Sequence, residues 1–217
     1  MKSILVIGLG RFGRHLSRNL IELGNEVMIV DKSEESLMEL LPLATSAQIC
    51  DCTKEEVLRS LGIGNFDLCF VCVGSSFQSN LEITSLLKDL GAKYVISRVS
   101  RDIHVKFLLR NGADEVADPE RDIAEKMAVR YSAKNVFDYI EITKDVAIVE
   151  IPPIDSWIGK SIRDVDLRAK YHVSIIATKA YDKVLPITSA DHIFKADEHL
   201  MVMGDHKDVE KILKKID

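Results

Sequence analysis

Three glycines near the start of the chain, Gly8, Gly10 and Gly13, have the spacing of a turn that holds the phosphates of a nucleotide. In such a turn the first glycine permits the bend, the second lets the backbone approach a phosphate, and the third lets helix and strand pack closely. The helix that follows offers free N–H donors and a partial positive charge to an anion. Arg11 and Phe12 complete the motif, so we include all five residues in the expected site.

An acidic residue follows the second predicted strand where a ribose-binding carboxylate is expected. Asp31 comes directly after the apolar run Val27–Val30 and 18 residues after Gly13. Its carboxylate would accept hydrogen bonds from the ribose hydroxyls and would disfavour a 2′-phosphate, which argues against NADP. Alternatively, Asp31 caps a helix that begins near Ser33. We expect nucleotide binding here and include the neighbouring Lys32 in the site.

Three further strand ends are expected on the same side of the sheet, where ligands bind in open α/β folds. Asp51 either accepts a hydrogen bond from an adenine amino group or caps a helix near Lys54. Gly74 would permit close approach of the nucleotide. Arg98 either pairs with a phosphate or forms a salt bridge with Asp102 or another acid. The candidate binding residues at these strand ends are Asp51, Cys52, Thr53, Val73, Gly74 and Arg98.

The four cysteines include a C-x-x-C spacing, which is typical of zinc and redox sites. However, Cys69 and Cys72 belong to the run Asp67–Val73, which has the pattern of a buried strand. Residues i and i+3 of a strand point to opposite faces, so these two sulfurs cannot bind one ion. We therefore predict that the cysteines are small apolar core residues.

The composition is that of a soluble globular protein. The chain has 217 residues, 47% hydrophobic and 29% charged, with a net charge of -5. No apolar run approaches the ~20 residues that span a bilayer, so we expect a cytoplasmic protein. Lys and Arg number 17 against 19 Asp and Glu in residues 1–135, and 12 against 15 in residues 136–217. Without a basic surplus, nucleic acid is not an expected partner.

Strand-like and helical runs alternate through residues 1–135, which predicts an α/β fold with a Rossmann-like, doubly wound parallel sheet. The predicted strands are Ser3–Ile7, Glu26–Val30, Ser46–Cys50, Leu68–Val73, Tyr94–Ser97 and Glu115–Ala117. The predicted helices are Arg11–Leu23, Glu34–Leu41, Glu55–Leu61, Ser79–Leu90, His104–Arg110 and Arg121–Tyr131. Several of these helices end at a glycine, the usual stop signal.

The pattern changes after residue 135, where a small α+β lobe is expected. Tyr139–Thr143 and Val146–Ile151 predict a hairpin, Val173–Thr178 and Leu200–Met203 predict further strands, and Lys207–Ile216 predicts a final helix. The expected domains are therefore a nucleotide-binding domain with a crossover helix, residues 1–135, and a C-terminal lobe, residues 136–217.

The glycine motif, Asp31, the element Asp51-Cys52-Thr53 and the second lobe together resemble RCK (KTN) proteins. These are cytosolic subunits that regulate bacterial and archaeal potassium transporters and channels of the KtrA and TrkA type. Residues Ile158–Arg168 are similar to the opening helix of the family's C-terminal lobe, and the resemblance covers essentially the whole chain. It implies a nucleotide-sensing gating subunit, not an enzyme, that assembles as dimers into an octameric ring. It also implies a membrane potassium transporter or channel subunit as partner, which would hold the protein at the inner face of the cell membrane.

The resemblance also implies roles for individual residues. Arg11 matches an arginine that reaches a terminal phosphate from a neighbouring subunit. Glu120 matches an acid that helps bind a divalent cation near the nucleotide. Cys52 departs mildly from the small residue that usually follows the acid of the third strand, and Arg98 stands where relatives carry Lys or Arg.

The ligands that the resemblance implies are adenine nucleotides. The single-unit length is similar to KtrA-type subunits, which favour ADP and ATP, whereas TrkA-type proteins are associated with NAD(H). In some relatives the second lobe binds cyclic di-AMP. Ile162, Ile175 and Pro186 would line such an apolar cleft, or else they are core residues.

Two other functions are compatible with a Rossmann-like sheet. An NAD-dependent oxidoreductase needs a proton donor or acceptor beside the nicotinamide. No histidine shows an orienting partner in the sequence; the histidines are His15, His104, His172, His192, His199 and His206. A redox-sensing transcription factor needs a DNA-binding segment, and none is recognisable. We therefore favour the gating subunit, with the apolar faces of Ile123–Val129 and Val136–Ile140 as candidate subunit contacts.

Overall fold

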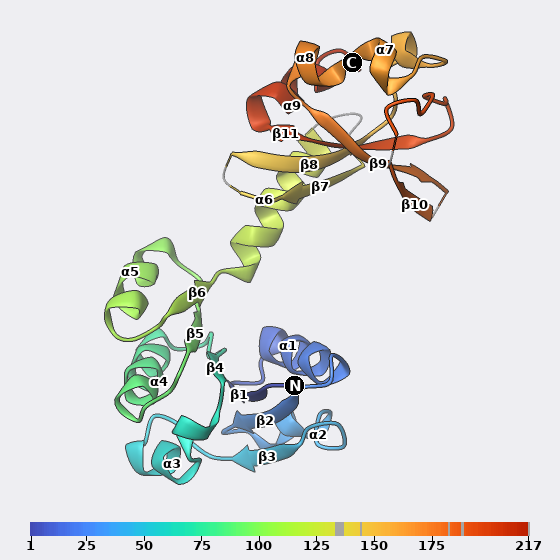
Figure 1. Cartoon of the computed structure of the whole chain (residues 1–217). Coiled ribbons are helices and arrows are strands. Elements are labelled where there is room, and N and C mark those ends of the chain that lie inside the picture. The colour runs from blue at the N-terminus through green and yellow to red at the C-terminus, as the bar shows by residue number, and fades with distance from the viewer. Residues whose placement is uncertain (133–136, 144, 182, 188, 217) are drawn as a thin grey trace. The chain divides into compact units, whose positions relative to one another are not determined.

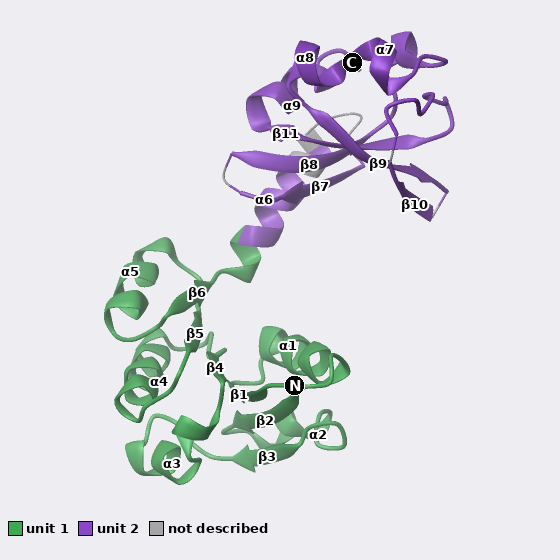
Figure 2. Cartoon of the chain, viewed as in Figure 1, with its two compact units in different colours: residues 1–121 green, residues 122–217 purple. Residues whose placement is uncertain are grey.

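A computed structural model of the chain describes all residues except 133–136, 144, 182, 188 and 217 (Figure 1). The chain separates into two compact units, residues 1–121 and 122–217 (Figure 2). Helix α6, Pro119–Ser132, contains the division between them. The sequence pattern predicted the boundary between the two domains after residue 135. In the structure the boundary between the compact units falls after residue 121, so most of α6 belongs to unit 2.

Unit 1 is built on a six-stranded sheet with the order β3-β2-β1-β4-β5-β6, and every pairing is parallel. Its strands are β1 Ser3–Ile7, β2 Glu26–Asp31, β3 Ser46–Ile49, β4 Leu68–Val71, β5 Val95–Arg98 and β6 Glu115–Ala117. The doubly wound parallel sheet predicted from the sequence is confirmed, with strand ends within two residues of the expected ones. The strand order reverses between β1 and β4, and ligands bind at such a switch point.

All predicted helices of unit 1 are present: α1 Arg11–Glu22, α2 Glu34–Met38, α3 Glu55–Ser60, α4 Phe77–Asp89, α5 Asp102–Arg110 and the start of α6. Helix α2 is shorter than predicted because Leu41 precedes Pro42, and a residue before proline disfavours the helical conformation. Helix α4 begins two residues early because the Ser76 hydroxyl accepts from the Ser79 amide at 3.2 Å, a cap that the sequence analysis missed. Among the described residues, no helix is long and apolar enough to cross a membrane.

The two faces of the unit 1 sheet bury separate hydrophobic clusters, as expected when helices cover both sides. On one face, Leu5 and Cys69 pack with residues of α3 and α4. On the other, Ile4 and Cys72 pack with residues of α1 and α2. The two sulfurs of the C-x-x-C sequence therefore lie in different clusters, which confirms their interpretation as core residues.

Unit 2 contains a five-stranded antiparallel sheet with the order β10-β9-β11-β8-β7. Its strands are β7 Asp138–Glu141, β8 Val146–Ile151, β9 Ser174–Ala180, β10 Lys183–Pro186 and β11 His199–Asp205. The predicted hairpin is confirmed as β7 and β8. Strand β10 was not predicted, because all four of its residues are exposed and it lacks the alternation that marks a half-buried strand.

The helices of unit 2 after α6 are short: α7 Ile162–Val165, α8 Leu167–Tyr171 and α9 His206–Leu213. The single helix that the resemblance implied over Ile158–Arg168 is interrupted at Asp166, whose φ of 54° is left-handed. The core of this unit is a separate cluster that includes Val149, Trp157 and Phe194.

We predict that only Cys50 reacts with Ellman's reagent in the native protein. Burial raises the pKa of Cys69 and of Cys72 to about 12, so at pH 8 roughly one such thiol in ten thousand is the reactive thiolate. Burial also raises the pKa of Cys52, whereas Cys50 is only half-buried. Cys50→Ser should abolish the native-state reaction, and all four wild-type thiols should react in urea. Rapid reaction of two or more thiols without urea would contradict the buried positions.

Candidate functional site

A cavity of about 440 Å³ is formed by the glycine turn and residues following β2, β3 and β4, together with the end of β5. It contains every predicted binding residue except Arg11 and Gly13: Gly8, Gly10, Phe12, Asp31, Lys32, Asp51, Cys52, Thr53, Val73, Gly74 and Arg98. It also contains residues that the sequence analysis missed, notably the serines Ser75, Ser76 and Ser79. Their signal was present in the sequence, since small polar residues after a strand mark a loop that leads into a helix.

The glycine turn is held against the end of β4 by contacts that only glycine permits. Gly8 has a φ of 93°, and a Cβ there would lie 3.0 Å from the Val73 amide nitrogen. A Cβ on Gly13 would lie 2.0 Å from the Gly8 carbonyl oxygen, so the start of α1 touches the turn itself. At Gly10, in contrast, a Cβ would meet no atom within 4 Å. Gly10 therefore faces open space in the cavity, as the phosphate-approach position requires.

Asp31 ties the end of β2 to the glycine turn. Its Oδ2 accepts a hydrogen bond from the Leu9 amide at 2.6 Å, and its Oδ1 accepts one from the Ser33 amide at 2.9 Å. The second bond forms a turn to the N-cap residue of α2 and is not a helix cap, because Ser33 occupies the N-cap position and α2 receives no side-chain capping hydrogen bond. A carboxylate has about four acceptor sites, so both oxygens retain capacity for ribose hydroxyls. The capping alternative for Asp31 is therefore wrong, and the ribose-binding role stays a prediction.

Asp51 forms a turn of its own rather than capping α3. Its Oδ1 accepts from the Thr53 hydroxyl at 2.8 Å and from the Thr53 amide at 3.1 Å, and these bonds hold the pKa of Asp51 below its usual value. Helix α3 has Lys54 at its N-cap and receives no side-chain hydrogen bond. The neighbouring side chains of Cys50 and Cys52 also line the cavity, and their thiols are hydrogen-bonded to each other. Because cysteine is a weakly polar residue, the two side chains give this part of the cavity an apolar floor.

Arg98, at the end of β5, brings a half-buried positive charge to the cavity lining. Its side chain is 19% exposed, and it forms an ion pair with Glu120 through Nη2. Its Nη1 lies 2.1 Å from where a Cβ on Gly74 would be, so a side chain at position 74 would displace the guanidinium from its present position. The acid that pairs with Arg98 is thus Glu120 and not Asp102, which pairs with Arg121 instead.

A buried amide fixes the strand ends around this arginine. The side-chain amide of Asn80, on α4, donates to the Val73 carbonyl at 3.0 Å and to the Arg98 carbonyl at 2.8 Å. Asn80 is 2% exposed, and its two bonds join the ends of β4 and β5. Sequence reasoning missed this residue because a single asparagine in a helical run carries no distinctive signal.

Two residues with implied roles lie away from the cavity lining. Arg11 is exposed on α1 beside Arg14, His15 and Arg18. Glu120, the candidate cation ligand, is engaged by Arg98. Within the described ranges, no group of three or more His, Cys, Asp or Glu side chains could hold a metal ion.

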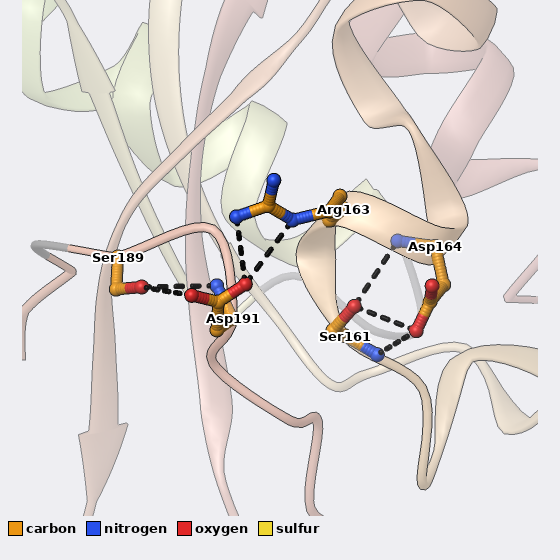
Figure 3. Close-up of polar contacts among 5 residues, drawn as sticks. All are labelled: Ser161, Arg163, Asp164, Ser189 and Asp191. Carbon is orange, nitrogen blue, oxygen red and sulfur yellow. Dashed lines mark hydrogen bonds and ion pairs between the residues drawn. The ribbon is translucent and has the colours of Figure 1, made fainter.

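A second cavity of about 300 Å³ lies in unit 2 and contains Ile162 and Ile175, two of the three residues expected around cyclic di-AMP. The third, Pro186, lies on β10 and is not among the lining residues. The cavity also contains Arg163 and Arg168. Arg163 donates to Asp191 at 2.8 Å, as Figure 3 shows.

The start of α7 beside this cavity is held by a capping box. The Ser161 hydroxyl accepts from the Asp164 amide at 3.1 Å, and the Asp164 carboxylate accepts from the Ser161 amide at 3.2 Å (Figure 3). Asp191, the partner of Arg163, also accepts a hydrogen bond at Oδ2 from the Ser189 hydroxyl at 3.2 Å. The wall that carries Arg163 is therefore ordered by these polar contacts and by Val165, which α7 buries in the core of unit 2.

Comparison with known proteins gives matches to both units. Residues 4–119 match the TrkA-N domain, and residues 146–217 match the TrkA-C domain. Ktr system potassium uptake protein C of Bacillus subtilis is 36% identical over 99% of this chain and 97% of its own length. Ktr system potassium uptake protein A of the same organism is 35% identical over 97% of this chain and 95% of its own length.

The fold is also similar to that of solved channel structures. The GsuK channel bound to NAD superposes with a TM-score of 0.70 over 100% of this chain and 39% of that one, at 18% sequence identity. At this identity the likeness concerns the fold alone.

We predict that two alanine substitutions in the glycine turn separate folding from ligand approach. Gly13→Ala places a Cβ against the Gly8 carbonyl oxygen, so it should destabilise the ligand-free protein by about 2 kcal/mol, or roughly 4 to 8 °C in Tm. The Cβ that Gly10→Ala adds would point into open space, so the Tm of the ligand-free variant should stay within about 1 °C of the wild-type value. Thermal unfolding without nucleotide measures both, and equal Tm losses would contradict the described turn.

Proposed function

The chain belongs to the RCK (KTN) family of TrkA-N and TrkA-C domain proteins, and from this premise we propose that it is a nucleotide-sensing regulatory subunit of a membrane potassium transporter or channel. Two relatives that match it along nearly their whole length are Ktr potassium uptake proteins. We propose that it works at the cytoplasmic face of the membrane, held there by its transporter partner.

The observation that carries the proposal is the cavity at the strand switch point. A glycine turn with open space above Gly10, a carboxylate at Asp31 and a cation at Arg98 complement the phosphates and sugar of a nucleotide. The apolar floor of Cys50 and Cys52 suits an adenine ring, with Asp51 at its edge to accept from the amino group. These features occur together in one cavity of unit 1.

The charge at Arg98 favours ADP or ATP over NAD(H). In a dinucleotide, the second half extends from the phosphates beyond the glycine turn, and in NAD⁺ it carries a positive nicotinamide ring. Gly74 and Arg98 lie side by side in the cavity lining, and the guanidinium attracts a terminal phosphate and repels the cationic ring of NAD⁺. ADP or ATP is therefore the proposed ligand, and NAD(H) is the alternative.

An NAD-dependent oxidoreductase is less consistent with the cavity. A hydride-transfer site needs a proton donor or acceptor beside the nicotinamide. No histidine or tyrosine belongs to the described lining of the cavity, and its lysine, Lys32, lies beside the ribose carboxylate. His104 is stacked on Phe77 at 3.7 Å, outside this lining. We therefore propose a binding protein and not an enzyme.

Gating requires that the nucleotide bind two conformations with different affinity, because equal affinity shifts no equilibrium. We propose that the copies assemble as dimers into an octameric ring in which Arg11, exposed on α1, reaches the terminal phosphate held by a neighbouring copy. A divalent cation at Glu120 would then offset the accumulated negative charge. Both side chains are accessible in the single chain, as this arrangement requires.

Apolar side chains exposed in the single chain support assembly. Ile123 and Met127, one helical turn apart on α6, are 55% and 51% exposed. Phe137 and Ile140 are also exposed, whereas Val136 lies outside the described residues. Sedimentation of the purified protein tests the ring, and a strict monomer at micromolar concentration would contradict it.

We propose cyclic di-AMP as a ligand of the cavity in unit 2. Ile162 and Ile175 provide apolar contacts for the adenines, and Arg163 and Arg168 provide charge for the phosphates. Calorimetric titration with cyclic di-AMP tests this, since binding that Ile175→Asp leaves unchanged would place the ligand elsewhere.

We predict that Asp31→Ala weakens ATP and ADP binding about 10- to 100-fold in calorimetry, with NAD⁺ and NADH titrated alongside. The loss corresponds to hydrogen bonds between a charged carboxylate and the ribose hydroxyls. Since Asp31 also holds the Leu9 amide, 2′-deoxy-ATP provides the control. The wild type should bind 2′-deoxy-ATP more weakly than ATP, and Asp31→Ala should not distinguish them. Absence of any adenine nucleotide binding by the wild type would overturn the proposed function.

A further inference from the structure

The ion pair between Arg98 and Glu120 joins two groups that nucleotide binding would separate. Arg98 belongs to the cavity lining, whereas Glu120 does not. Glu120 lies in the first turn of α6, and its side chain is 63% exposed against 19% for Arg98. The anion that now pairs with this half-buried cation is thus an exposed carboxylate of the chain itself.

Contacts connect this pair to the glycine turn through one short segment. Gly8 packs against the Val73 amide, and the next residue, Gly74, lies against the Arg98 guanidinium. A phosphate chain that starts at the turn and follows this segment reaches Arg98 on the side of the cavity. Arg98 also has a buried Nε without a hydrogen-bond partner, so its present partner leaves a donor unused.

We propose that Glu120 is an internal substitute for a nucleotide phosphate, which a ligand with a terminal phosphate must displace from Arg98. This inference rests on the proposed function and adds a specificity determinant to it. A triphosphate long enough to reach Arg98 replaces one carboxylate by a group of higher charge with three acceptor oxygens. AMP, whose single phosphate is held at the glycine turn, leaves the pair intact. Glu120 therefore makes the site discriminate by phosphate number.

Displacement also has a structural consequence, because Glu120 belongs to the helix in which the chain passes from unit 1 to unit 2. The ion pair fixes the first turn of α6 to the end of β5, and the ion pair of Arg121 with Asp102 at 3.2 Å fixes it to α5. Releasing Glu120 removes the attachment to β5. A nucleotide that occupies the cavity in this way loosens the attachment of the start of α6.

The test is calorimetry of the full-length protein with ATP and with AMP in buffer containing EDTA, so that no divalent cation takes part. Glu120→Gln should bind ATP roughly two- to fivefold more tightly than the wild type, which is the worth of an exposed ion pair, and AMP with unchanged affinity. Glu39→Gln is the matched control, because Glu39 pairs with Arg18 on the surface, is 58% exposed and does not belong to the cavity lining. It should leave both affinities unchanged.

A double mutant separates displacement from simple repulsion between Glu120 and the nucleotide. If Glu120 acts through Arg98, the gain from Glu120→Gln should disappear in an Arg98→Gln background. A gain that persists there, or unchanged ATP affinity in Glu120→Gln alone, would overturn the inference while leaving nucleotide sensing intact. Failure of the wild type to bind either nucleotide would overturn the proposed function as well.

Hydrogen exchange of the second turn of α6, whose amides donate to carbonyls of the first turn, gives an independent readout. ATP should accelerate exchange there in the wild type, whereas AMP should not. In Glu120→Gln the same amides should exchange rapidly without ligand, and in Glu39→Gln they should behave as in the wild type. Equal protection of this turn with and without ATP in the wild type would contradict the displacement.

Discussion

The structure of unit 1 depends on the close contact between the glycine turn and the end of β4. Gly13 lies against the carbonyl of Gly8, and Gly8 lies against the backbone of Val73, at distances that leave no room for a side chain. This contact brings β1 and β4, the two strands at the switch point, together at their carboxyl ends. The ends of β2 and β5 are then joined to it by Asp31 and Asn80, so the cavity is a consequence of backbone packing.

The regular parts of the fold could be predicted because their signals are local. Six apolar runs separated by helical periods determine a parallel sheet, and the glycine motif and Asp31 predict the edge at which the cavity is found. What the sequence could not supply were features set by partners far along the chain. The partner of Arg98 is 22 residues away, and no local pattern distinguishes Glu120 from Asp102. The exposed strand β10 and the break at Asp166 likewise depend on neighbours in the folded lobe rather than on periodicity.

The polar groups around the cavity are arranged so that one ligand can affect several elements. Asp31 orders the start of α2, Arg98 contacts both Gly74 and the start of α6, and Asn80 joins β4 to β5. A nucleotide bound among these groups would strengthen some of these contacts and weaken others. The free energy that couples ligand binding to a conformational change is typically about 1–3 kcal/mol. Such a change is sufficient to bias two conformations of an assembly, provided that the ligand distinguishes between them.

The exposed strand β10 also affects how copies of unit 2 can associate. It lies at one end of the five-stranded sheet, begins at Lys183 and ends at Pro186. A lysine opposes edge-to-edge stacking through its charge, and a proline has no N–H to offer to an added strand. This border of the sheet is therefore protected against strand addition and amyloid-like growth, and association of the lobes at this border must use side-chain contacts instead.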